Sequence, residues 1–121
     1  MRPTGRTFKP WTEVFRIDSM PEFIYLIHPY RNGFFENPTP EENAVMDEHF
    51  DYLKEATKAG RVLLAGPCLD ETFGVVILHA ENEAAANAFM FNDPSVKKNT
   101  MASELHPMRI SLVSPSILEK K

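Results

Sequence analysis

The amino-acid sequence predicts an α+β fold with four strands and two helices in the order βαββαβ. Three patterns indicate this order: a sharply bounded amphipathic helix after one apolar strand, two further strands joined by a short connection, and an alanine-rich helix before a last strand. Two βαβ units with right-handed crossovers combine into a four-stranded antiparallel sheet with both helices on one face.

Length and composition fit one globular domain, since 121 residues with 43% hydrophobic and 25% charged side chains can bury a sizeable core. A net charge of -4 argues against a nucleic-acid-binding protein, which usually carries a basic face. No apolar run approaches the roughly 20 residues that span a bilayer, and the N-terminal stretch lacks the apolar segment of a secretory signal. The single cysteine, Cys68, cannot form an internal disulfide, so we expect a structural thiol and a cytoplasmic protein.

The first strand and the first helix are the best-marked elements. Residues 22–28 (EFIYLIH) are apolar on both parities, which is typical of a strand buried on both faces. The helix begins after Thr39, which forms a capping box with Glu42 and precedes Pro40 at the first helical position, and it stops at Gly60. Its apolar row, which we expect to face the core, consists of Val45, Met46, Phe50, Leu53 and Ala56.

The remaining chain supplies three strands and the second helix. Two strands of a hairpin-like unit cover residues 61–66 and 73–80. The second helix covers residues 81–92 and stops at Asp93-Pro94. After a turn or short helix, the last strand covers residues 105–113.

The sheet face away from the helices also needs a cover, because the first and third strands are apolar on both parities. Because the chain is short, the simplest way to bury this face is to pack it against a second subunit. We therefore predict a homodimer packed sheet to sheet. We divide the chain into an N-terminal arm (1–20), one domain (21–113) and a C-terminal tail (114–121).

His49 is the main candidate for chemistry, because a titratable ring stands in the apolar row of the first helix. Its simplest interpretation is a core histidine hydrogen-bonded to backbone. A carboxylate partner changes this interpretation: Asp93 could accept from one ring nitrogen, fix the tautomer and leave the other nitrogen to move a proton. Asp93 also has a structural interpretation, as a cap for the backbone N–H of Val96.

Connectivity suggests a second group of candidates. His28, Asp93 and His106 should lie toward one end of the molecule and His79 toward the other, so that His28 and His106 meet across neighbouring strands. With Asp93 they could hold a metal, but no close-spaced pair such as HxH or CxxC supports this. The simpler interpretation is a pair of solvent-edge residues at strand ends, and we assign no metal and no cofactor.

Further substrate-binding candidates lie on the strands and the loop after the first strand. Arg31 and Arg109 are candidate anion holders, although Arg109 could instead form an ion pair at the surface or between subunits. Tyr25 could line the same pocket and donate its hydroxyl. Gly66-Pro67 offers backbone close to a ligand, although a turn alone explains this dipeptide.

Three segments of the sequence resemble the YCII-related (YciI-like) family: FFENPTPEENAVMDEHFDYLKEATKAGRVLLAGPCLD, FGVVILHAENEAAANAFMFNDPSV and ELHPMRISL. The resemblance covers roughly residues 21–113 and leaves the N-terminal arm unexplained. It implies a ferredoxin-like subunit of a dimeric α+β barrel, with an active site around a histidine on the first helix and an aspartate just before proline. These correspond to His49 in DEHF and Asp93 in NDP.

Related barrels in the same superfamily include muconolactone isomerases and small monooxygenases, which act on ring compounds. The resemblance therefore implies a lyase or isomerase that uses a His49–Asp93 acid/base pair on a small organic substrate, such as an aromatic or lactone-like ring, without a cofactor. The alternative is a non-catalytic dimeric module that binds a ligand or a protein, with His49 structural. A cofactor-free oxygenase follows only from superfamily analogy.

Overall fold

The computed structural model describes residues 21–119, so the predicted N-terminal arm and the last two residues of the tail lie outside the described range. The elements in chain order are β1 (Glu22–Pro29), α2 (Pro40–Lys58), β2 (Val62–Pro67), β3 (Gly74–His79), α3 (Glu83–Asn92), α4 (Pro94–Lys97), β4 (Met101–Met108) and the 3-10 helix η1 (Pro115–Glu119).

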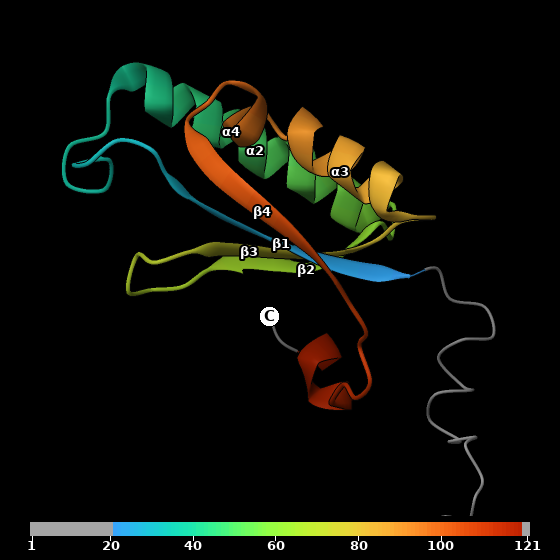
Figure 1. Cartoon of the computed structure of the whole chain (residues 1–121). Helices are drawn as coiled ribbons and strands as arrows, with labels where there is room; N and C mark the ends of the chain where they lie inside the picture. The colour runs from blue at the N-terminus through green and yellow to red at the C-terminus, as the bar shows by residue number, and fades with distance from the viewer. Residues whose placement is uncertain (1–20, 120–121) are drawn as a thin grey trace, which may run out of the picture.

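The four strands form one antiparallel sheet in the order β2-β3-β1-β4. Both long helices lie on the same face of this sheet, and the short α4 lies on that face too (Figure 1). This strand order with helices on one side is the ferredoxin-like arrangement. The predicted α+β class and the βαββαβ order are therefore confirmed.

Helix α2 begins where its sequence predicts. The Thr39 hydroxyl accepts the backbone N–H of Glu42 at 3.0 Å, and the Glu42 carboxylate accepts the N–H of Thr39 at 2.9 Å, which completes the capping box. Gly60 follows the last turn with φ +82°, a conformation that glycine adopts without steric cost. These two ends define the extent of the helix, so that His49 lies midway along α2.

The core lies between the sheet and the helices. Its buried side chains include Phe23, Tyr25 and Ile27 of β1, Val76 and Leu78 of β3, and Ala86, Phe89 and Met90 of α3. On the opposite face, which we call the open face, Ile24, Leu26, Val75 and Ile77 are only half-buried. The chain after β4, including η1, lies on the open side of the sheet (Figure 1). The central strands are therefore closed on one face and partly exposed on the other.

Strand β4 starts earlier than the sequence predicts, at Met101 instead of Leu105. Met101 is buried and pairs with Pro29 at the end of β1. The residues that follow Met101 are mostly small or polar, so the sequence shows no apolar run at the true start of the strand. Pro107 is tolerated because β4 is an edge strand, where a missing N–H costs no ladder bond.

This shift in β4 separates two histidines that the connectivity had placed together. His28 pairs with Ala102, whereas His106 pairs with Ile24, farther back along β1. The prediction that His28 and His106 meet across neighbouring strands is therefore wrong. His79 pairs with Glu22 at the end opposite His28, as expected.

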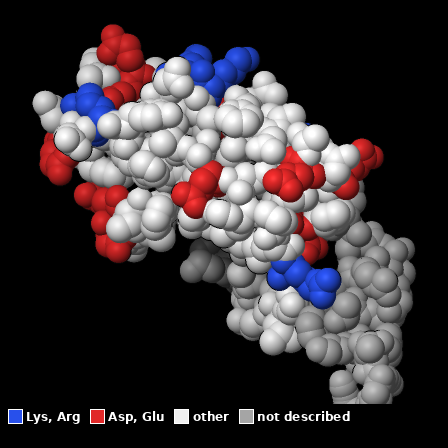
Figure 2. All heavy atoms as spheres, in the orientation of Figure 1, with Lys and Arg blue, Asp and Glu red and all other residues white. Residues whose placement is uncertain are grey.

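Charged side chains are spread over the surface. Figure 2 shows acidic and basic groups separated by uncharged residues on the visible face. Within residues 21–119, no helix is long and apolar enough to cross a membrane. A concentration of polar groups lies instead beneath α2, where the carboxylate of Asp93 is fully buried.

Candidate active site

A histidine from α2 and an aspartate from the joint between α3 and α4 form the centre of the site. The His49 Nδ1 atom lies 2.8 Å from Oδ1 and 2.9 Å from Oδ2 of Asp93. The aspartate side chain is fully buried, and the histidine side chain is 13% exposed. Because an ionised carboxylate only accepts, Nδ1 carries the proton and donates it to Asp93. The second ring nitrogen, Nε2, has no hydrogen-bond partner among the described residues.

Asp93 is held by three further donors. The Tyr25 hydroxyl donates to Oδ2 at 2.7 Å. The backbone N–H and the hydroxyl of Ser95 donate to Oδ1 at 2.9 Å and 2.8 Å. Burial opposes ionisation of Asp93, but the hydrogen bonds from His49, Tyr25 and Ser95 outweigh it and lower the pKa of the carboxyl below its ordinary value. The aspartate is therefore an ionised carboxylate that hydrogen-bond donors hold in place.

The local backbone explains why the aspartate stands there. Asp93 ends α3 and caps the N-terminus of α4, with Pro94 at the first helical position. The expected cap of Val96 by the carboxylate differs in detail: the carboxylate accepts from Ser95, while the N–H of Val96 bonds to the backbone carbonyl of Asp93 at 2.9 Å. The carboxylate thus has both functions at once, capping α4 and binding the histidine.

Tyr25 lies in the core beneath His49 and Asp93 and does not line a pocket. Burial, followed by the adjacent charge of Asp93, raises the pKa of the Tyr25 hydroxyl far above its ordinary value. The phenol therefore stays protonated and acts only as a donor to the aspartate. The predicted substrate contact of Tyr25 is not what the geometry shows, because its side chain is completely buried in the core.

Two contacts position α2 over this network. The Tyr52 hydroxyl donates to the backbone carbonyl of Phe89 at 2.7 Å, and the two rings stack at 4.8 Å. Burial and the charge of Asp93 raise the pKa of Tyr52 to about 12. On the surface, Lys98 forms an ion pair with Glu48 at 2.7 Å, which joins the C-terminal end of α4 to α2 next to His49.

A cavity of about 770 Å³ lies between α2 and the β2–β3 hairpin, and His49 is part of its wall. The lining is mostly apolar, with Met46, Phe50 and Leu53 on the helix side and Phe73 on the hairpin side. Phe50 is 65% exposed, so the expectation that it packs in the core is wrong: it stands at the cavity. An apolar cavity of this size with one titratable ring in its wall is a typical small-molecule site.

The chain matches the model of the YCII-related domain over residues 23–108. The chain belongs to the YCII-related family. No curated protein matches the chain.

In this YCII-related protein, the predicted site residues separate into two groups. His49 lines the cavity together with the dipeptide Gly66-Pro67 of β2, and Asp93 stands directly behind the histidine. Cys68 also lies in the cavity wall. The structure therefore brings together residues from α2, β2 and the α3–α4 joint, which are far apart in the sequence.

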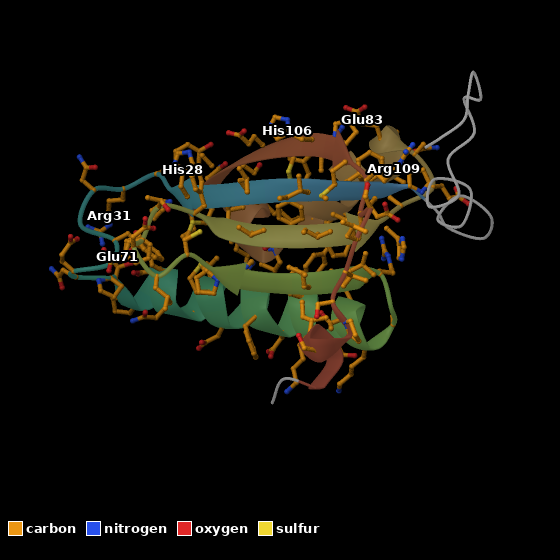
Figure 3. All side chains as sticks on the ribbon, turned by 90° about the horizontal axis from the view of Figure 1, so that it is seen from below. His28, Arg31, Glu71, Glu83, His106 and Arg109 are labelled. Atoms are coloured by element: carbon orange, nitrogen blue, oxygen red, sulfur yellow. The ribbon has the colours of Figure 1, made fainter. Side chains whose placement is uncertain are left out.

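The other predicted binding residues do not line this cavity. Arg31 donates to Glu42 at 2.7 and 2.8 Å and to loop carbonyls, so it fastens the loop before α2. His28 lies near that end of the sheet, whereas His106 and Arg109 lie toward the other end (Figure 3). His106 bonds to Glu104 at 2.7 Å and is exposed.

Ser95 is the site residue that the sequence analysis missed. Its signal is its place two residues after an aspartate and one after a proline, the spacing at which an aspartate side chain turns back to bond the backbone. No group of three or more histidine, cysteine or acidic residues within residues 21–119 has a metal-binding arrangement.

Proposed function

We propose that this YCII-related protein is a small-molecule enzyme of the lyase or isomerase type, in which His49 transfers a proton to or from a substrate bound in the cavity. The observation that carries the proposal is the His49–Asp93 contact at 2.8 Å in the wall of the cavity. A ring nitrogen that is free toward a largely apolar space is placed to accept or return a proton of a bound molecule.

The roles of the surrounding residues follow from their hydrogen bonds. Asp93 keeps the proton on Nδ1, which leaves the lone pair of Nε2 as the base, and its negative charge stabilises the imidazolium that forms. Tyr25 and Ser95 prevent the carboxylate from rotating away and keep it ionised. Gly66-Pro67 and the aromatic lining of the cavity would contact a ring substrate such as an aromatic compound or a lactone.

Exchange of acidic C–H protons for deuterium tests this proposal and does not require the natural substrate. We would incubate the protein with α-angelica lactone and with 2-indanone in D₂O and follow the loss of the C–H signals by NMR. We expect catalysed exchange that falls about a hundredfold or more in His49→Gln, the size typical of general acid–base catalysis.

The matched control is His28→Gln, which removes an exposed histidine outside the cavity lining. It should exchange both probes at the wild-type rate. If wild type and His49→Gln exchange equally, the proposed role of His49 in proton transfer is wrong.

A second candidate function is a non-catalytic module that binds a small ligand, with His49 structural. The observation that favours it is the enclosure of the ring, which ties α2 to the α3–α4 joint through a buried carboxylate. In that case His49→Gln would lower the free energy of unfolding and leave ligand binding intact. The deuterium exchange experiment separates the two functions, because a binding module catalyses no exchange.

We also propose that two copies of the chain pack through the open face. The half-buried Ile24, Leu26, Val75 and Ile77 support this, because their apolar side chains gain from removal from water. Sedimentation should give twice the chain mass for the wild type and a single chain mass for Leu26→Glu. Leu69→Glu is the matched control, since Leu69 is 94% exposed on the hairpin and should leave the dimer intact.

A cytoplasmic location belongs to the same proposal. Its support is the single cysteine of the sequence, which is half-buried as a free thiol in the cavity wall.

A further inference from the structure

We propose that the ligand of the cavity is an apolar monocarboxylic acid whose chain or ring lies along α2 and whose carboxylate meets Lys54 and Lys58. The inference deepens the proposed function and rests on it only for the reacting end of the ligand, which lies at His49. The acid-binding end depends on other residues of the same helix, so it can be tested separately.

Two rows of α2 side chains face the cavity. His49, Leu53 and Thr57 follow one another at intervals of four residues and form the inner row. Phe50, Lys54 and Lys58 form the outer row at the same interval. Toward the C-terminal end of α2, the inner row changes from an imidazole to a hydroxyl. The outer row changes from an aromatic ring to two ammonium groups.

The opposite wall offers an apolar surface to the body of the ligand. Phe73 and Val76 line the cavity from the hairpin and β3, and Gly66 presents backbone there. A hydrocarbon chain or ring fits this space without leaving a buried polar group unpaired.

The charges at the cavity favour an anion at the Lys58 end. Lys54 forms no ion pair within the described residues, and Lys58 has only a loose, exposed contact of 3.7 Å with Glu55. The acidic residue of the lining is Glu71. It lies on the β2–β3 hairpin at the end of the molecule that carries Arg31, which is the end where α2 starts (Figure 3). A carboxylate would therefore lie near two cations and away from Glu71.

The helix also sets the length of the ligand. At a rise of about 1.5 Å per residue, the backbone positions of Lys54 and Lys58 lie about 8 and 14 Å along the axis from His49. A molecule with its reacting atom at Nε2 and its carboxylate at the lysines therefore has a body about as long as a chain of eight to ten carbons. Acids of this length serve as probes for the site.

Calorimetric titration of the full chain with butanoate, hexanoate, octanoate, 1-octanol and octylamine tests the inference. We expect the affinity to rise about fourfold for each added methylene group that enters the apolar cavity. At low salt, octanoate should bind about fivefold more tightly than 1-octanol, and octylamine should bind most weakly.

The double variant Lys54→Gln/Lys58→Gln should remove the preference for octanoate over 1-octanol and leave the binding of 1-octanol unchanged. Both lysines are exposed, so the variant should fold, which its melting temperature checks. Lys97→Gln, outside the cavity lining, is the matched control and should keep the preference. Amide NMR shifts at Thr57 and Cys68 on octanoate binding would place the ligand in the cavity.

The inference is overturned if octylamine or 1-octanol binds as tightly as octanoate, if the double variant keeps the preference, or if none of the five probes binds. His49→Gln separates this result from the proposed function, because it should lose proton exchange while still binding octanoate. Octanoate binding without catalysed exchange would contradict the proposed function alone. Catalysed exchange without a carboxylate preference would contradict this inference alone.

Discussion

Two carboxylates of this protein, Glu42 and Asp93, make similar sets of hydrogen bonds and yet stand in different surroundings. Glu42 accepts two bonds from Arg31 and one from a backbone N–H. Asp93 accepts from His49, Tyr25 and Ser95. Hydrogen bonds lower the pKa of both carboxyl groups, and the pKa of Glu42 falls to about 2.

The two carboxylates differ in whether the side chain that binds them lines the cavity. Arg31 holds a loop at the surface, and neither it nor Glu42 lines the cavity. The partner of Asp93 is a histidine that lines the cavity and whose second ring nitrogen has no hydrogen-bond partner among the described residues. A lowered carboxyl pKa therefore does not by itself indicate an active site. The combination of a buried carboxylate, a titratable partner and a cavity is what supports the active site proposed at His49.

The largest effect in this comparison is expected for Asp93→Ala. It leaves His49, Tyr25 and Ser95 without their acceptor in a buried site, so the free energy of unfolding should fall by about 3–5 kcal/mol. Urea denaturation measures this change. Asp93→Asn keeps the shape and should cost less, about 1–3 kcal/mol, while still abolishing proton exchange. A loss of less than 1 kcal/mol in Asp93→Ala would contradict the role of Asp93 as a buried anchor.

An intermediate effect is expected for Tyr25→Phe, which removes one buried donor and keeps the ring. The free energy of unfolding should fall by about 1–2 kcal/mol. The pKa of Asp93 should rise toward its ordinary value, because one of the hydrogen bonds that lower it is gone.

The pH dependence of Tyr25→Phe follows from the sign of this shift. A depressed carboxyl pKa contributes stability above the pKa of the unfolded chain, and this stability is lost as the pH falls through the folded value. Below about pH 4, wild type should therefore lose more stability than Tyr25→Phe. Urea denaturation at several pH values between about 2 and 5 checks this, and parallel curves would contradict it.

The smallest effect is expected for Arg31→Ala. The Arg31 guanidinium holds the pKa of Glu42 at about 2, against an ordinary value of 4.5. Its removal should raise the Glu42 pKa toward that ordinary value, which carboxyl NMR titration measures. The stability that Glu42 contributes above its unfolded pKa, and loses as the pH falls toward 2, should shrink. Proton exchange should stay at the wild-type rate, and a large loss would show that this loop reaches the cavity.

The sequence could predict those features that depend on local chemistry. The capping box of Thr39 and Glu42 and the stop at Gly60 define α2 from a few residues, and the apolar β1 and β3 define the centre of the sheet. The pairing of His49 with Asp93 was predicted only with the help of the family resemblance, since the two residues are distant in the chain.

Features that depend on register and on shape could not be predicted in this way. The start of β4 is set by the contact of Met101 with the end of β1, and the sequence contains no apolar run there. Phe50 matched the core period of the helix, but the space opposite it is the cavity and not another side chain. Ser95 was missed because its function arises from the turn that Asp93 and Pro94 make.

In the proposed site, Asp93 fixes the proton on Nδ1 of His49 and leaves Nε2 free toward the cavity. Nitrogen-15 NMR of the imidazole, at a pH where the ring is neutral, measures this directly. We predict a protonated, pyrrole-type Nδ1 and a bare, pyridine-type Nε2 in the wild type, with loss of this preference in Asp93→Asn. A proton on Nε2 in the wild type, or the same tautomer in both proteins, would show that Asp93 does not fix the proton on Nδ1.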